Sequence, residues 1–332
     1  MLRFRSKQLW VGLSTLLLVG IFFSTVELSG VLIAASKVGW LGLLQIFFLV
    51  AVTQLIRAVR FFELLSLRIN IQYSLVLQIT CIYQFLNHIL PIRSGELSLP
   101  ILLKRYSNCT YSSSVAFLVL TRLYDVLALA IIVFLAAAVL IYRGVIEPFW
   151  LFVFISALLL AMLLISLLIL CVRTRNPRQR QNAINNLAIA KVPLFLKQLF
   201  FNFKTFGSNL YHEFLIYKGI LLHLRLLSYS VSIWLALFLL FWRVLQLVGF
   251  YVSFSEVVLG SSLANLTQLL PINTLGNIGT LEAGWVLGFT MLGFDSYKTL
   301  TAGIVMHVIV IVAAGTYGIV SWIVLSLKAN HR

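Results

Sequence analysis

The chain has 332 residues, of which 61% are hydrophobic and only 10% are charged. A soluble domain of this length cannot bury that much apolar surface, so most of the chain must lie in lipid. The apolar stretches are continuous rather than alternating, which excludes a transmembrane β-barrel. The composition therefore predicts an all-α polytopic membrane protein.

The net charge of +16 comes from basic residues that lie beside the apolar stretches rather than in one patch. This distribution is typical of the topological bias of membrane proteins and of attraction to anionic headgroups, so no nucleic-acid partner is predicted. Cys81, Cys109 and Cys171 have no paired spacing. They indicate small buried side chains rather than disulfides or metal ligands.

Six apolar segments are long enough to cross a bilayer, which takes about 20 residues. The predicted spans are 9–28, 40–62, 111–141, 148–172, 229–254 and 299–327. The first follows a short basic start and resembles a signal peptide. It is too long for a signal sequence, so we expect a retained helix.

Two further apolar segments are shorter, and each ends at a break that contains Pro and Gly. The first break runs from Leu90 to Glu96 and the second from Leu270 to Glu282. A second short apolar piece follows each break. Interrupted helices at matching places in two halves of a chain are typical of transporter-like folds. The pattern predicts two re-entrant helical hairpins, at about 73–105 and 256–293.

The positions of the basic residues favour this arrangement. With both termini in the cytoplasm and both hairpins re-entrant, 17 basic residues lie inside and three outside. Residues 1–142 and 143–332 then have the same order of elements in opposite orientations, which is an inverted-topology repeat. The cytoplasmic basic segment 173–228 predicts an amphipathic helix on the anionic inner leaflet; a solvated linker is the alternative.

Charged side chains at membrane depth are costly, at about 2.5–3.5 kcal/mol each, and therefore mark functional positions. Eight such residues are predicted: Arg57, Arg60, Arg93, Arg122, Arg243, Glu96, Asp125 and Glu282. Five cations against three anions leave a positive surplus, which a phosphate headgroup would neutralise, since Arg binds phosphate bidentately. The alternative is mutual neutralisation that only holds the helices together.

Within this set, we expect Arg93 and either Arg57 or Arg60 to contact phosphate. Glu96, Asp125 and Glu282 would orient the arginines or bind a cationic part of the headgroup. Asn87 and Asn277 would satisfy free backbone groups or contact the ligand, and His307 would form an interhelical hydrogen bond rather than a proton relay. The sequence has no phosphate-binding loop, zinc motif or nucleophile elbow, so no catalytic residue, metal or cofactor is predicted.

The segment Asn87 through Glu96, Arg122 with Asp125, the Arg57/Arg60 pair and Pro271 to Glu282 resemble a known family. It is the membrane region of the lysylphosphatidylglycerol synthase (multiple peptide resistance factor) family and its flippase-like relatives. The resemblance implies a bacterial or archaeal plasma (inner) membrane protein that moves a phospholipid or lipid-linked headgroup between leaflets. It also implies a functional polar set of Arg93, Glu96, Arg122, Asp125 and Glu282.

The chain departs from the family pattern in two places. The basic residue that often follows the Gly-Glu pair is missing, because Leu97-Ser98-Leu99-Pro100 intervenes, and Asn277 stands where a Gly is common. Both departures leave the identity of the headgroup open. The soluble aminoacyl-transfer domain is not seen, so lysyl-lipid synthesis is not expected.

The leading hypothesis is a lipid translocase that binds an anionic headgroup between two opposed hairpins. The first alternative is an intramembrane lipid-modifying enzyme that uses Glu96 and Glu282 as paired acid and base. The second is an accessory subunit that recruits a cell-envelope enzyme through 173–228. The lipid, the energy source, the direction of transport and whether the chain forms a homo-oligomer stay open.

Overall fold

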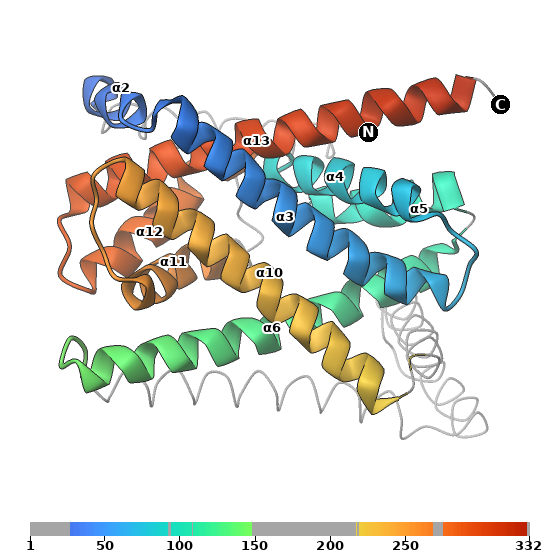
Figure 1. Cartoon of the computed structure of the whole chain (residues 1–332), viewed down its shortest axis with the longest axis horizontal. Helices are drawn as coiled ribbons and strands as arrows, with labels where there is room; N and C mark the ends of the chain where they lie inside the picture. Colours follow the sequence, from blue (N-terminus) through green and yellow to red (C-terminus); the bar gives the residue numbers. More distant parts are fainter. Residues whose placement is uncertain are drawn as a thin grey trace, which may run out of the picture.

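The computed structural model describes residues 27–91, 94–107, 109–147, 217, 219–267 and 275–330. These residues form helices joined by turns, and no strand occurs among them (Figure 1). The elements are α2 (Leu28–Ser36), α3 (Gly39–Ser66), α4 (Tyr73–Ile89), η1 (Ser94–Leu97), α5 (Ser98–Ser107), α6 (Tyr111–Tyr142), α10 (Ile220–Leu247), α11 (Phe254–Thr267), η2 (Leu275–Asn277), α12 (Thr280–Thr290) and α13 (Ser296–Asn330).

Four of these helices, α3, α6, α10 and α13, are long and apolar enough to cross a membrane. They correspond to four of the six predicted spans. The predicted span 148–172 and nearly all of 9–28 lie outside the described residues, as do residues 173–216 of the basic segment. The prediction of an all-helical membrane protein is confirmed at this level.

The predicted bounds 229–254 for the third of these helices are wrong, because α10 runs from Ile220 to Leu247. Its first turns, which contain Ile220, Leu221 and Leu222, are apolar enough to extend the helix into the segment assigned to the basic loop. The helix ends at a turn in which the N–H of Phe250 donates to the carbonyl of Leu245 at 2.8 Å. Hydropathy alone does not detect this turn.

The directions of the long helices follow from contacts near their ends. Arg68, just past the end of α3, donates to Ser113 near the start of α6 at 2.7 Å, so these two helices are antiparallel. Arg243 near the end of α10 donates to Gln45 near the start of α3 at 2.8 Å, so α10 is antiparallel to α3 as well. The chain therefore leaves α3 and enters α6 at the same end of the bundle.

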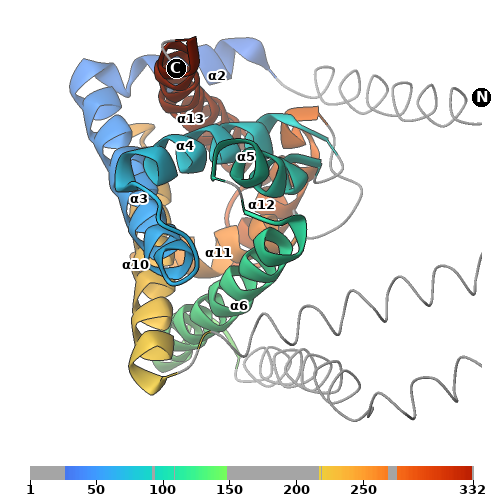
Figure 2. The ribbon, with the colours of Figure 1, turned by 90° about the vertical axis from the view of Figure 1, so that its right-hand side faces the viewer.

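The start of α13 lies at the opposite end of the bundle. Tyr297, in its first turn, donates to Glu27 beside α2 at 2.8 Å, close to where α3 begins. The chain thus leaves α10 and enters α13 at one end, opposite to the end that joins α3 and α6. Figure 2 shows the helices grouped around the long axis of the molecule, with α4 and α13 above and α6 below.

Each of these two connections folds as a helix, a break and a second helix. In the first, α4 contacts both η1 and α5, and in the second, α11 contacts α12. The α11–α12 contact is so close that a Cβ on Gly288 would lie 2.8 Å from the carbonyl carbon of Gly260. Each unit also packs on a long helix from the other half of the chain, α4 on α13 and α11 on α6.

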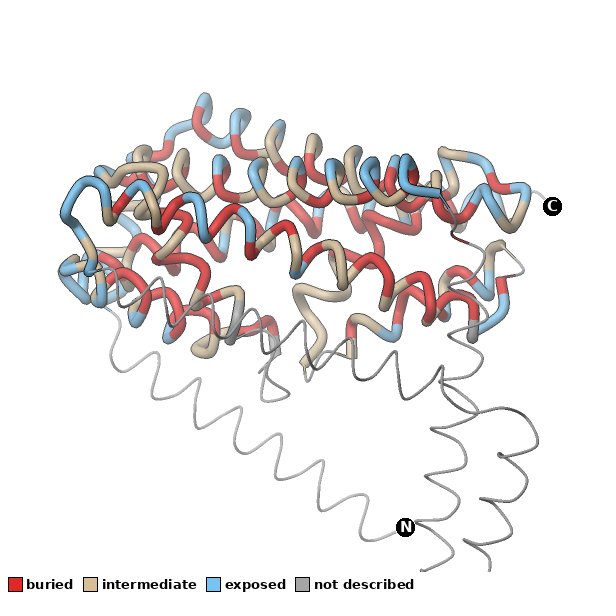
Figure 3. Tube along the Cα trace, turned by 90° about the horizontal axis from the view of Figure 1, so that it is seen from below, coloured by how far each residue is buried: buried red, intermediate tan, exposed pale blue. Residues whose placement is uncertain are grey.

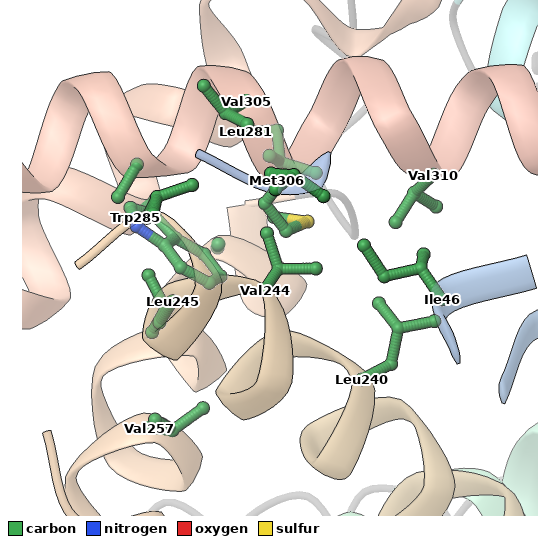
Figure 4. Close-up of a cluster of buried hydrophobic side chains, with 14 of the residues drawn as sticks. Ile46, Leu240, Val244, Leu245, Val257, Leu281, Trp285, Val305, Met306 and Val310 are labelled. Carbon is green, nitrogen blue, oxygen red and sulfur yellow. The ribbon is translucent and has the colours of Figure 1, made fainter. Parts of the chain in front are cut away.

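The interior is apolar and the outer faces carry large apolar side chains. One core cluster joins α3, α10, α11, α12 and α13 and includes Val244, Trp285 and Met306 (Figure 4). In Figure 3, buried residues alternate with exposed ones along each helix, as expected for helices that pack through one face. By contrast, Phe48 on α3 is 66% exposed and Val312 on α13 is 54% exposed, which is typical of a surface that contacts lipid.

The first break is held against α4 by Gly95. A Cβ at this position would lie 2.7 Å from the carbonyl oxygen of Leu86 and would overlap the backbone of Asn87. We expect Gly95→Ala to push η1 away from α4 and to destabilise the fold by about 1–3 kcal/mol. The midpoint of thermal unfolding in detergent measures this effect. Ser94→Ala is the comparison variant: it removes the hydrogen bond from the Ser94 hydroxyl to the Pro91 carbonyl at 2.6 Å without any overlap and should cost about 0.5–1.5 kcal/mol. A loss for Gly95→Ala no larger than that for Ser94→Ala would contradict the expectation.

Candidate functional site

Three long helices meet at a buried ion pair between Arg60 of α3 and Asp125 of α6. Nη1 of Arg60 lies 2.5 Å from Oδ1 of Asp125, and Nη2 lies 3.3 Å from Oδ2. The Arg60 Nη1 also donates to the hydroxyl of Ser230 on α10 at 2.6 Å. Arg60 is only 1% exposed, so these partners must compensate for the cost of burying its charge.

A second arginine extends this pair toward the first break. Nη2 of Arg122 lies 3.1 Å from Oε1 of Glu96 in η1, and Nη1 lies 3.6 Å from Oδ2 of Asp125. The same Nη2 donates to the hydroxyl of Tyr83 on α4 at 2.8 Å. Arg122 thereby connects α4, η1 and α6, and its side chain remains 34% exposed. We call Arg60, Asp125, Arg122 and Glu96 the four-residue network.

Arg57 lies beside this network without joining it. It is half-buried on α3, one turn before Arg60, and forms no hydrogen bond or ion pair within the described part of the chain. It lies within electrostatic range of Asp125, Arg60 and Arg122. Three guanidinium groups therefore face two carboxylates at this position. Among the described residues, Arg57 has no counterion, so it carries the surplus positive charge of this group.

The second break has an ion pair of its own. Oε1 of Glu282 in α12 lies 2.5 Å from Nδ1 of His307 in α13, and both side chains are buried. The other oxygen, Oε2, accepts the N–H of Gly279 at 2.7 Å, which satisfies a backbone donor at the start of α12. The expected interhelical hydrogen bond of His307 is therefore present. Its Nε2 atom is buried and has no hydrogen-bond partner among the described residues.

The predicted asparagines lie at the two breaks. Asn277 is buried in η2 with a left-handed backbone (φ 56°), and its carbonyl accepts the Thr280 hydroxyl at 3.1 Å. Asn87 is half-buried at the end of α4, where Gly95 packs against its backbone. The predicted phosphate ligand Arg93 lies outside the described residues. His88 lies within electrostatic range of both Arg57 and His307, and so stands between the two polar groups.

A family model described as the lysylphosphatidylglycerol synthase TM region matches residues 8–318 of the chain. The chain belongs to this family. The match spans both polar groups, the whole of α3, α6 and α10, and α13 as far as residue 318, so the resemblance inferred from the sequence is confirmed. Search of curated proteins and of solved structures finds no match.

Two side chains of this lysylphosphatidylglycerol synthase-type membrane domain escaped sequence analysis. The Tyr83 hydroxyl accepts a hydrogen bond from Arg122, and the Ser230 hydroxyl accepts one from Arg60. Both are neutral hydroxyl residues in apolar helices, where they give no periodic signal. The available clue was that arginines buried in an apolar helix need more acceptors than three carboxylates supply.

Sequence analysis also proposed Glu96 and Glu282 as paired acid and base. In this family member, each of the two carboxylates is bonded to a different basic side chain, Glu96 to Arg122 and Glu282 to His307. The two basic residues belong to different helices, α6 and α13.

Proposed function

We propose that the protein is a lipid translocase that holds an anionic phospholipid headgroup beside Arg57 while the acyl tails stay in the bilayer. The half-buried guanidinium of Arg57, with no counterion in the described part of the chain, carries this proposal. An arginine at membrane depth is costly unless an anion neutralises it. Phosphate suits this role, because its oxygens accept hydrogen bonds from guanidinium in pairs.

In this proposal, the α4–α5 and α11–α12 units are re-entrant hairpins that enter from opposite faces of the plasma membrane. The antiparallel course of α3 and α6 supports this, since the chain between them leaves and returns at one end of the bundle. The connection between α10 and α13 leaves and returns at the other end. The two hairpins belong to an inverted repeat, with the termini in the cytoplasm.

The four-residue network positions the headgroup site rather than binding the phosphate itself. Both Nη atoms of Arg60 are bonded, to Asp125 and Ser230, and the residue is only 1% exposed, so it has no accessible surface for a headgroup. Arg122 is engaged with Glu96 and Asp125 but is 34% exposed. A headgroup that reaches Arg57 would therefore meet Arg122 at the edge of the network. The predicted ligand Arg93 belongs to the same proposal through its position in the first break.

The test is reconstitution of the protein into vesicles that contain a fluorescent anionic phospholipid, with the rate of exchange between leaflets as the readout. We expect Arg57→Gln to lower this rate by about tenfold to a hundredfold, the worth of a hydrogen bond to a charged group. Arg57→Lys should retain part of the rate, because it keeps the charge but loses the bidentate geometry.

The matched control is Arg243→Gln, which removes an arginine of α10 that is bonded to Gln45 and Gln246. We expect it to retain the wild-type rate. Equal losses for the two glutamine variants, or no acceleration of exchange for any anionic phospholipid by the wild-type protein, would overturn the proposal. A product assay on the same vesicles separates translocation from lipid modification, since a translocase leaves the lipid chemically unchanged.

A further inference from the structure

The two ion pairs at the breaks occupy equivalent places in the chain. Each uses a glutamate directly after a break and a cation on the long helix that follows. Glu96 precedes Arg122 by 26 residues, and Glu282 precedes His307 by 25. Since α6 begins at Tyr111 and α13 at Ser296, each cation is the twelfth residue of its helix.

The packing of the helices has the same equivalence. The hairpin helix α5 contacts α6, and its counterpart α12 contacts α13. Across the two halves, α4 contacts α13 while α11 contacts α6, and α3 contacts α10. Exchanging each element with its counterpart therefore reproduces these contacts. The two ion pairs tie equivalent hairpins to equivalent helices.

The pairs differ in the chemistry of the cation. A guanidinium keeps its charge at all physiological pH values, whereas an imidazole ordinarily gains and loses a proton near neutrality. The Nε2 atom of His307 is buried and accepts or donates no hydrogen bond within the part of the chain that the structure describes. The first pair is therefore permanently charged, and the charge of the second depends on a proton.

The groups around His307 come from the helices that pack on α13. Glu282 of α12 contacts it directly, and His88 of α4 lies within electrostatic range, with Arg57 of α3 acting in turn on His88. Charged residues of two other helices that touch α13 are bonded elsewhere. These are Glu27 beside α2, which bonds Tyr297, and Arg243 of α10, which bonds Gln45.

We infer that Glu96–Arg122 and Glu282–His307 are equivalent latches, each holding a hairpin tip to the helix that follows, and that only the second responds to protons. His307 is then a positioning residue that acts through Glu282, whose Oε2 holds the N–H of Gly279 at the tip. Loss of the proton from His307 weakens the latch and frees the tip at 275–279. The inference rests on the two-hairpin arrangement of the proposed function but not on lipid movement.

The experiment measures how fast a cysteine at the second tip reacts with N-ethylmaleimide in the full-length, detergent-purified protein. Ile278→Cys is placed in a background in which the three native cysteines are changed to alanine. The protein with His307 is compared with the His307→Arg variant, which copies the permanently charged pair of the first half. The labelling rate with His307 is divided by the labelling rate with His307→Arg at each pH, because this ratio removes the intrinsic pH dependence of the thiol.

We expect this ratio to be close to one at pH 6 and to rise by about tenfold by pH 8.5, because a hydrogen bond between charged partners is stronger than one from a neutral donor. His307→Gln, which is always neutral, should label fast at both pH values and match the wild type only at high pH. This second comparison carries the test if His307→Arg is not monodisperse. A labelling ratio that does not change with pH in either comparison would overturn the inference.

The reciprocal experiment transfers the proton response to the first hairpin. In the same cysteine-free background with Ser94→Cys at the first tip, Arg122→His should create a rise in the labelling ratio with pH that the Arg122 protein lacks. No such rise would contradict the equivalence of the latches. Since no lipid is moved in these measurements, their outcome is independent of the exchange assay with Arg57→Gln.

Discussion

Replacing Asp125 with alanine should destabilise the fold by about 3–5 kcal/mol. The change leaves the Arg60 guanidinium, which is 1% exposed, in an apolar interior with only the Ser230 hydroxyl as a partner. It also removes the second carboxylate that Arg122 faces. Denaturation of the purified protein with dodecyl sulfate, followed by circular dichroism, measures the loss.

Two further variants separate the ion pair from general packing. Arg60→Met with Asp125→Leu removes both charges together and should recover most of the lost stability, because no buried charge then lacks a partner. Ser230→Ala removes one hydrogen bond to Arg60 and should cost only about 1–3 kcal/mol. If the double variant is as unstable as Asp125→Ala, the cost comes from lost shape rather than from the unpaired guanidinium.

Gly288→Val should destabilise the fold by about 3 kcal/mol or more, at or above the upper end of the usual range for overpacking. Its Cβ would overlap the backbone of Gly260, and a backbone cannot turn aside as a side chain does. The helices α11 and α12 would have to separate, which would displace Glu282 from His307. The midpoint of thermal unfolding measures the loss of stability.

Ala283→Val is the matched control for this change, because Ala283 is exposed on the same helix α12. It adds the same β-branched side chain where nothing opposes it and should change stability by no more than about 0.5 kcal/mol. Comparable losses for both variants would mean that a β-branched side chain destabilises α12 wherever it is placed, and that the close approach of α11 and α12 does not explain the effect.

The fold class and the long helices were accessible to sequence analysis because continuous apolar length is a one-dimensional property. The helices α3, α6 and α13 begin and end within four residues of the predicted bounds. The bounds of α10 were wrong because a turn closed by Phe250 and Leu245 interrupts a stretch that remains apolar. Hydropathy measures the cost of exposure to lipid and is insensitive to where a backbone turns.

The candidate site was only partly accessible for a different reason. Sequence spacing placed Arg122 and Asp125 on one face of a helix, and the structure adds Arg60 of another helix as the closer partner of Asp125. Pairing across helices depends on crossing positions, which no local pattern encodes. The structure was likewise needed to distinguish Arg57 from Arg60. Arg57 has no counterion among the described residues, whereas Arg60 is bonded to Asp125 and Ser230. Sequence analysis treated these two arginines as interchangeable.

The packing of α4 on α13 has a consequence for how the chain is made. Helix α5 ends at Ser107, whereas α13 begins at Ser296, so about 190 residues must be synthesised before α4 can pack on α13. At roughly 5–20 residues per second, the delay is about 10–40 s. During that interval, the face of α4 that packs on α13 in the finished protein has no contact with that helix.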